Sequence, residues 1–163
     1  MIGWIIGGVG VAAVTWVIAG YNGFIWLKNK ISELGQNIRN YSEQRETIVQ
    51  KISTMVAETY SKHEKGTFKE VAEMRSKSKD AGKFMNFVVE RYPKLKAIKA
   101  FSDLRVEISD IERDITDNKN ILAESIKEWN VKVQAFPDNL LAGMFNFKSL
   151  DMRTVVENES KEN

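Results

Sequence analysis

The chain has 163 residues, a formal net charge of +2, one histidine and no cysteine. Its length predicts one main folded domain, and the lack of cysteine excludes disulfides, thiolate zinc sites and cysteine nucleophiles. One histidine excludes multi-histidine metal sites, and the small net charge gives no electrostatic basis for nucleic-acid binding. The charge is unevenly placed, because all 24 Lys and Arg and all 22 Asp and Glu lie at or after Lys28.

Residues 1–27 carry no charged side chain and are predicted to form a transmembrane anchor. Within them, residues 2–20 are mostly apolar and have the length of about 20 residues that a helix needs to cross a bilayer. Nothing basic precedes this run, and it is too long for the apolar part of a signal peptide. Four aromatic residues lie near its ends or just after it, where such rings favour the membrane interface: Trp4, Trp16, Tyr21 and Trp26.

The flanking charges predict the orientation of the anchor. No Lys or Arg precedes it, whereas Lys28, Lys30 and Arg39 follow it. By the positive-inside rule, we expect a single-pass protein of the cell membrane with its N-terminus outside and its helical domain in the cytoplasm. The lipid bilayer is therefore the first expected partner.

Residues 28–150 are predicted to form an elongated antiparallel bundle of three long helices, so the fold class is all-α. Apolar side chains recur at helical spacing from Ile31 to Tyr60, and no proline precedes Pro93, so the first helix is expected to continue to about Lys62. The second is expected to begin at a capping box over residues 67–70 and to end at Pro93. The third follows from Phe101 until Pro137 stops it.

Counting three alternating passes predicts where the turns lie. The turn over residues 92–99 would return to the bilayer, where Lys94, Lys96 and Lys99 either contact anionic headgroups or are ordinary solvated lysines. The apolar stretch 140–145 would lie far from the membrane as a short C-terminal cap on the turn around Glu64. If exposed instead, it would be a partner site. Residues 151–163 are predicted to be a polar tail, disordered from Glu157.

The search for chemistry gives no catalytic residue, no cofactor site and no metal site. His63 begins the sequence HEKGT, which is not the zinc motif H-E-x-x-H, and is interpreted as a cation near a helix C-terminus. An acidic row on the third helix is interpreted as a solvated face, with a cation site or a docking face for a basic partner as the alternative. Its members are Asp103, Glu107, Asp110, Asp114 and Asp117.

Several short motifs, in order, resemble the LemA family of bacterial membrane proteins as far as about Lys148. The residues are Tyr21-Asn22, Leu27-Lys28-Asn29, Tyr60, His63-Glu64, Val71, Arg75, Tyr92-Pro93, Leu95-Lys96-Ala97, Phe101, Leu104, Glu112, Trp129-Asn130, Phe136-Pro137, Leu140 and Ala142-Gly143-Met144-Phe145. The chain departs from the family at residues 44–50, which lack the proline of the family's Arg-Arg-x-Asp-Leu-Ile-Pro-Asn box. It departs again at Leu122-Ala123, where the family has Tyr-Asn.

The resemblance implies a single-pass membrane protein with an N-terminal anchor, a long helical bundle and no established enzymatic activity. Some relatives are associated with building magnetosome membranes. The favoured hypothesis is thus a non-enzymatic, membrane-anchored helical scaffold of the bacterial envelope, with other membrane or envelope-associated proteins as partners and no nucleic acid. The alternative is a lipid-acting protein that senses or shapes the membrane. A metal-dependent enzyme is a third hypothesis, and the oligomeric state is left open.

Overall fold

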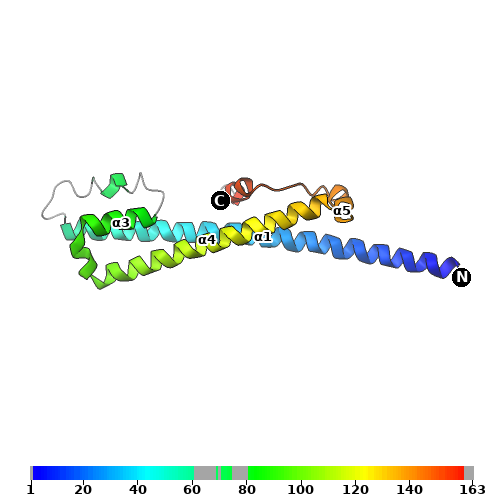
Figure 1. Cartoon of the computed structure of the whole chain (residues 1–163), viewed down its shortest axis with the longest axis horizontal. Helices are drawn as coiled ribbons and strands as arrows, with labels where there is room; N and C mark the ends of the chain where they lie inside the picture. Colours follow the sequence, from blue (N-terminus) through cyan, green and yellow to red (C-terminus); the bar gives the residue numbers. More distant parts are fainter. Residues whose placement is uncertain (1, 61–68, 70, 75–80, 160–163) are drawn as a thin grey trace. The chain divides into compact units, whose positions relative to one another are not determined.

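The computed structural model describes residues 2–60, 69, 71–74 and 81–159. Within these residues the secondary structure is helical and contains no strand, which confirms the all-α prediction. Figure 1 shows the elements in chain order. They are α1 (Ile2–Tyr60), α3 (Ala81–Arg91), the 3₁₀ helix η1 (Pro93–Ala97), α4 (Lys99–Gln134), α5 (Asp138–Met144) and α6 (Met152–Glu159).

Two of these helices are long. α1 is uninterrupted over 59 residues and α4 over 36. Neither contains a proline, so every backbone N–H beyond the first turn can reach the carbonyl four residues earlier. The predicted end of the first helix near Lys62 lies just outside the described residues, because α1 is described as far as Tyr60.

The predicted second helix is described only in part. Lys69 and residues 71–74 are helical, and α3 begins at Ala81. The capping box over residues 67–70 lies outside the described residues except for Lys69. The predicted stop at Pro93 agrees with the structure, because Tyr92 leaves the helical region with φ −124° and ψ 67°.

The chain divides into two compact units, and both long helices contribute to both of them. One unit combines Met1–Asn37 with Asn118–Asn163, and the other is Ile38–Asp117. Leu27 and the preceding Phe24 are buried within the first unit, and the predicted domain boundary after Leu27 stays a prediction. Each unit is described separately below.

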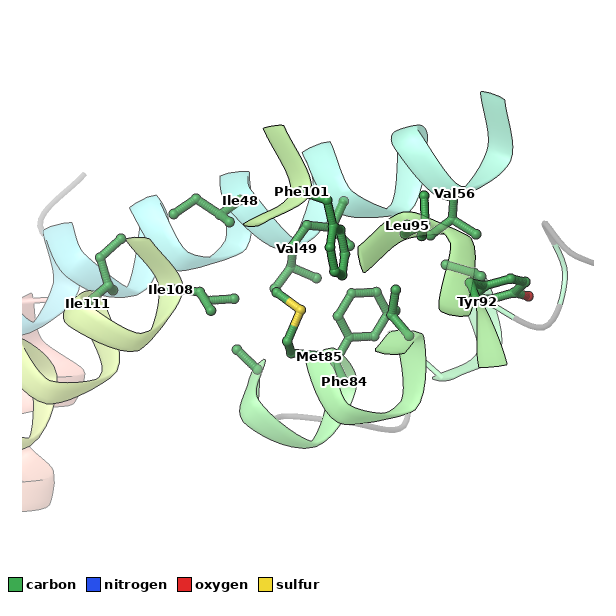
Figure 2. Packing of buried hydrophobic residues seen from close by; sticks show 14 of the residues in the cluster. Ile48, Val49, Val56, Phe84, Met85, Tyr92, Leu95, Phe101, Ile108 and Ile111 are labelled. Atoms are coloured by element: carbon green, nitrogen blue, oxygen red, sulfur yellow. The ribbon is translucent and has the colours of Figure 1, made fainter. Parts of the chain in front are cut away.

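The core of unit Ile38–Asp117 joins three helices around the C-terminal half of α1. Ile48, Ile52 and Val56 alternate with polar positions at helical spacing and are almost completely buried. Figure 2 shows Phe84 and Met85 of α3 pointing toward this face and toward Phe101 of α4. The buried residues of α3 lie on one side of the helix, so α3 packs on this core with that side and exposes the other side to solvent.

The turn between α3 and α4 lies beside Tyr60, the last residue of α1. The rings of Tyr60 and Tyr92 are 4.9 Å apart, and Leu95 of η1 is completely buried in the same cluster. The predicted return of the second helix to the membrane exit is therefore wrong. The return pass is made by α4, since Glu112 of α4 reaches back to Arg45 of α1.

The core of unit Met1–Asn37 with Asn118–Asn163 is formed by α1, α4, α5 and the C-terminal segment. Its members that are almost completely buried are Phe24, Leu27, Ile31, Leu34, Leu122, Ile126, Trp129, Leu141 and Ala142. The predicted tail differs, because Met152–Glu159 is α6, with Val155 only 9 % exposed. Burial of that one apolar side chain fixes a helix where the local composition is polar.

The predicted location of the C-terminal apolar cap is also wrong. Leu141 of α5 packs on Gly20 of α1, and Phe145 stacks near Tyr21. The stretch 140–145 therefore lies at the exit of the apolar segment, and Glu64 is outside the described residues. The physical reason is the direction of α4. Its C-terminal end packs at Phe24 of α1, so α5, which follows it, lies there as well.

Candidate functional site

The first part of α1 is an apolar helix that the rest of the described chain leaves mostly uncovered. Trp4 is 90 % exposed, and the large apolar side chains that follow it are also exposed: Ile6, Val9, Val11, Val14 and Ile18. By length and composition, α1 can cross a membrane, and only 6 % of its most apolar stretch is buried by the rest of the chain. A helix that is apolar on all sides requires an apolar surrounding.

The second part of the uncharged run has the opposite environment. At Gly20 an added β-carbon would overlap the side chain of Leu141. Glycine therefore permits the close approach of α5 to α1 at this point. From Gly20 onward, α1 is a component of a packed core.

An aromatic cluster holds the C-terminal segment against this part of α1. The ring of Phe24 lies 5.4 Å from Trp129 in an edge-on arrangement and 4.8 Å from Phe147 in a stacked one. Tyr21 lies 4.7 Å from Phe145. Such pairs add about 0.5–1.5 kcal/mol each beyond the area that they bury.

The turn after α5 directs Phe147 into the aromatic cluster. Asn146 has φ 57°, a left-handed conformation that asparagine tolerates better than most residues. The Phe147 amide donates to the Ala142 carbonyl at 2.9 Å, as in the six-to-one bond of a Schellman helix end. The chain thereby reverses immediately after α5 and brings Phe147 back to Phe24.

Polar contacts fix the same segment to α4. The Trp129 indole N–H donates to the Lys148 carbonyl at 2.8 Å. The Asn130 side chain donates to the Leu150 carbonyl at 2.9 Å and accepts from the Leu150 amide at 2.8 Å. These bonds satisfy backbone groups that no strand or helix could pair, so they define the path of residues 148–150.

An ion pair joins α4 to the first residue of α5. Lys132 Nζ lies 3.0 Å from Asp138 Oδ2 and 5.1 Å from the centre of the Phe24 ring. Both side chains of the ion pair are 26 % exposed, so the pair is partly shielded from solvent. It orients α5 and leaves the carboxylate of Asp138 matched by a cation.

The four predicted interface aromatics have different surroundings. Trp4 is fully open and Trp16 is partly buried. Tyr21 contacts the C-terminal segment, as described above. Trp26 is 60 % exposed, with Lys30 Nζ 5.2 Å from its ring centre. Their location at a membrane interface stays a prediction.

The predicted basic turn is exposed. Lys94 and Lys96 are in η1, and Lys99 begins α4. All three are exposed, on a turn that packs beside Tyr60. Their contact with a membrane stays a prediction.

The acidic row lies on the outer side of α4. Four of its members are exposed and Asp114 is partly buried. Asp110 pairs with Arg113 at 3.1 Å, an exposed contact within one helix. Among the described residues, no group of three or more acidic or histidine side chains is arranged to hold a metal ion. His63 lies outside the described residues.

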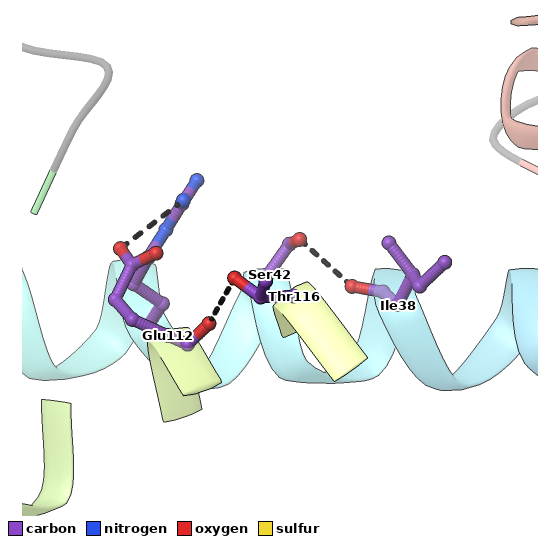
Figure 3. Close-up of polar contacts among 5 residues, drawn as sticks. Ile38, Ser42, Glu112 and Thr116 are labelled. Carbon is purple, nitrogen blue, oxygen red and sulfur yellow. Dashed lines mark hydrogen bonds and ion pairs between the residues drawn. The ribbon is translucent and has the colours of Figure 1, made fainter. Parts of the chain in front are cut away.

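Arg45 and Glu112, the latter one of the family-like residues, form an ion pair between α1 and α4. Arg45 Nη1 lies 3.5 Å from Glu112 Oε1, and both side chains are about a third exposed or less. Figure 3 shows Ser42 and Thr116 nearby, each donating to a carbonyl of its own helix. A partly exposed pair at this distance orients the helices more than it stabilises them.

Sequence analysis did not predict the contact of the C-terminal segment with α1. A signal was present, because Tyr21-Asn22 and Leu140 to Phe145 are both among the family-like motifs. Motifs in two distant segments of the chain do not give the distance between these segments in space, so they could not predict the contact.

The fold and the exposed apolar helix define a class of protein, an all-α chain with one long helix able to span a membrane. The family model described as LemA family matches residues 34–163, which is most of the chain. The chain belongs to the LemA family, as the motifs predicted. Comparison with curated proteins and with solved structures gave no match.

Proposed function

We propose that this chain is a single-pass protein of the bacterial cell membrane that acts, without catalysis, as a helical scaffold for other envelope-associated proteins. The observation that carries the proposal is the exposure of the apolar side chains between Trp4 and Ile18. In water, this surface would be unfavourable by about 25 cal/mol for each Å² of apolar area. In hydrocarbon the apolar side chains carry no such cost, and the helix pairs its own backbone groups.

The charges favour one orientation for this anchor. Lys28 and Lys30 directly follow the uncharged residues 1–27. The positive-inside rule then puts the N-terminus outside and the two packed units in the cytoplasm.

The scaffold part of the proposal rests on the surfaces that the packed units present. The acidic row of α4, from Asp103 to Asp117, faces outward on one continuous helix. A regular row of carboxylates is complementary to a basic surface and gives specificity to an encounter. We therefore expect the partners to be membrane or envelope-associated proteins with basic docking faces.

The alternative is a protein that senses or shapes the bilayer. Its support from the sequence was the lysine turn of Lys94, Lys96 and Lys99, which is exposed and lies beside Tyr60. A contact between the C-terminal segment and lipid is considered separately in the next subsection.

Two measurements test the anchoring and the orientation. Alkaline carbonate extraction should leave the full chain in the membrane pellet, and release into the supernatant would contradict anchoring. Reporter fusions after Asn163 should give a cytoplasmic signal, and an external signal would reverse the orientation.

Mild crosslinking followed by affinity purification tests the scaffold role. The wild-type chain should recover a recurrent envelope protein. A variant with Asp103, Glu107 and Asp110 changed to Asn is the matched comparison, and it should recover less of the same protein. Recovery of lipid and chaperones alone from both would contradict the scaffold role.

A further inference from the structure

α5 and Phe136, two residues before it, expose large apolar side chains. Phe136 is 80 % exposed, Met144 71 % and Leu140 53 %. Leu140 and Met144 are four residues apart, so they lie on the same side of α5. Exposed apolar groups gathered in one place mark a contact surface.

The neighbouring side of α5 and the residue after it are fixed to α1. Leu141 is completely buried against Gly20, and the Phe145 ring lies 4.7 Å from Tyr21. Figure 1 shows α5 beside α1 at the end of α4. The exposed side chains are therefore held next to the point where the open apolar stretch of α1 gives way to a packed core.

The length of that stretch indicates where this point lies relative to a bilayer. From Ile2 to Gly20 the helix rises about 28 Å at 1.5 Å per residue. A bilayer has a hydrocarbon core of about 30 Å. If residues 2–19 cross it, Gly20 lies at the boundary between acyl chains and headgroups, and α5 lies beside it.

We propose that α5 is a membrane-surface contact, in which Phe136, Leu140 and Met144 insert into the interfacial layer of the same bilayer that α1 crosses. This inference rests on the proposed anchoring. The occupant is lipid, because Ile18 and Tyr21 are exposed three residues apart on one side of α1. The Tyr21 ring lies 4.7 Å from Phe145, which is adjacent in the chain to the exposed Met144. A short amphipathic helix lying in the interface buries its apolar side in this way.

The charges of α5 fit this location. Asp138 is the one acidic residue in the sequence of α5, and it is paired with Lys132 at 3.0 Å. Without that cation, a carboxylate here would be repelled by anionic phosphates. Lys148, which follows the aromatic cluster, is exposed and can meet the headgroups.

The chain has no cysteine, so single cysteines can report the surroundings of chosen positions. Leu140→Cys and Met144→Cys probe the exposed side of α5. Ala13→Cys probes the exposed stretch of α1, and Ile121→Cys is the matched control on an exposed apolar position of α4. Each full-length variant carries an environment-sensitive fluorophore in vesicles of phosphatidylethanolamine and phosphatidylglycerol. Quenchers are nitroxides at the lipid headgroup or deep in the acyl chain, and aqueous iodide.

The expected pattern separates the four positions into three groups. Ala13→Cys should be quenched most by the deep nitroxide. Leu140→Cys and Met144→Cys should be quenched most by the headgroup nitroxide, at least about twofold more than Ile121→Cys, as for an interfacial helix. Ile121→Cys should respond to iodide.

Two results would overturn the inference while anchoring stands. In the first, Ala13→Cys is quenched by deep lipid but Leu140→Cys and Met144→Cys respond to iodide like Ile121→Cys. In the second, both α5 positions are shielded from lipid and iodide alike, which means that a protein covers them. If Ala13→Cys itself responds to iodide and not to lipid, the anchoring has failed and the inference fails with it.

Discussion

Two consecutive stretches of α1 have similar uncharged, apolar sequences and opposite surroundings. Before Gly20 the large side chains are exposed, with Trp4 at 90 %, whereas Phe24 and Leu27 after it are almost completely buried. The difference comes from residues more than a hundred positions later, because Trp129, Leu141 and Phe147 cover the second stretch. Apolar composition shows that a segment avoids water, and it does not show whether lipid or protein replaces the water.

Removing the second stretch in addition to the first is expected to have the largest effect on the stability of the packed core. A fragment of residues 20–163 keeps the core, whereas a fragment of residues 28–163 loses Phe24 and Leu27. Loss of one core phenylalanine costs about 3–5 kcal/mol, which lowers the melting temperature of a domain of this size by about 10–20 °C. Circular dichroism melts of the two fragments measure the difference.

The single change Phe24→Ala in the longer fragment should reproduce most of that loss. Val14→Ala in the full chain is the matched change in the exposed stretch, and it should leave the melt of the packed units unchanged. Equal melting of fragments 20–163 and 28–163 would mean that the comparison between the two stretches is wrong.

A charge in the exposed stretch should affect membrane insertion without affecting the core. Ala13→Lys places a cation in the middle of the apolar helix, at a cost of about 3 kcal/mol for insertion. We expect a clear increase in the fraction extracted by alkaline carbonate, whereas Gln36→Lys, at an exposed position beyond the anchor, should behave as wild type. Unchanged extraction of Ala13→Lys would argue against a hydrocarbon surrounding.

The contact between Gly20 and Leu141 can be broken by adding volume. Gly20→Val forces α5 away from α1, and overpacking of this kind costs about 1–3 kcal/mol. Gly10→Val is the control, because no atom lies within 4 Å of a β-carbon at Gly10. Thermal unfolding of the two full-length variants should differ, and identical melts would show that α5 is not held at Gly20.

The smallest expected effect concerns the segment that carries Phe147. Asn130→Ala removes both hydrogen bonds to the Leu150 backbone, at about 1–2 kcal/mol in total. Amide hydrogen exchange at residues 148–150 should accelerate, with Asn120→Ala at an exposed position of α4 as the control. Unchanged exchange in Asn130→Ala would show that the aromatic cluster alone holds the segment.

The sequence by itself determined the helices of this protein. The sequence predicted α1 from the lack of proline before Pro93 and from the helical spacing between Ile31 and Tyr60. It predicted the end of α4 from Pro137. These are local properties, because a helix pairs each N–H with a carbonyl four residues away. The uncharged run likewise predicted a helix able to cross a membrane, and the motifs predicted the LemA family.

Only the tertiary structure decided which helix returns to the start of α1. The prediction gave that role to the second helix, and it did not place the stretch 140–145 beside Gly20 and Tyr21. In the structure α4 returns instead, so Trp129 meets Phe24 and Leu141 meets Gly20. Such contacts are fixed by shape complementarity between side chains far apart in the chain, and spacing along one helix does not encode it.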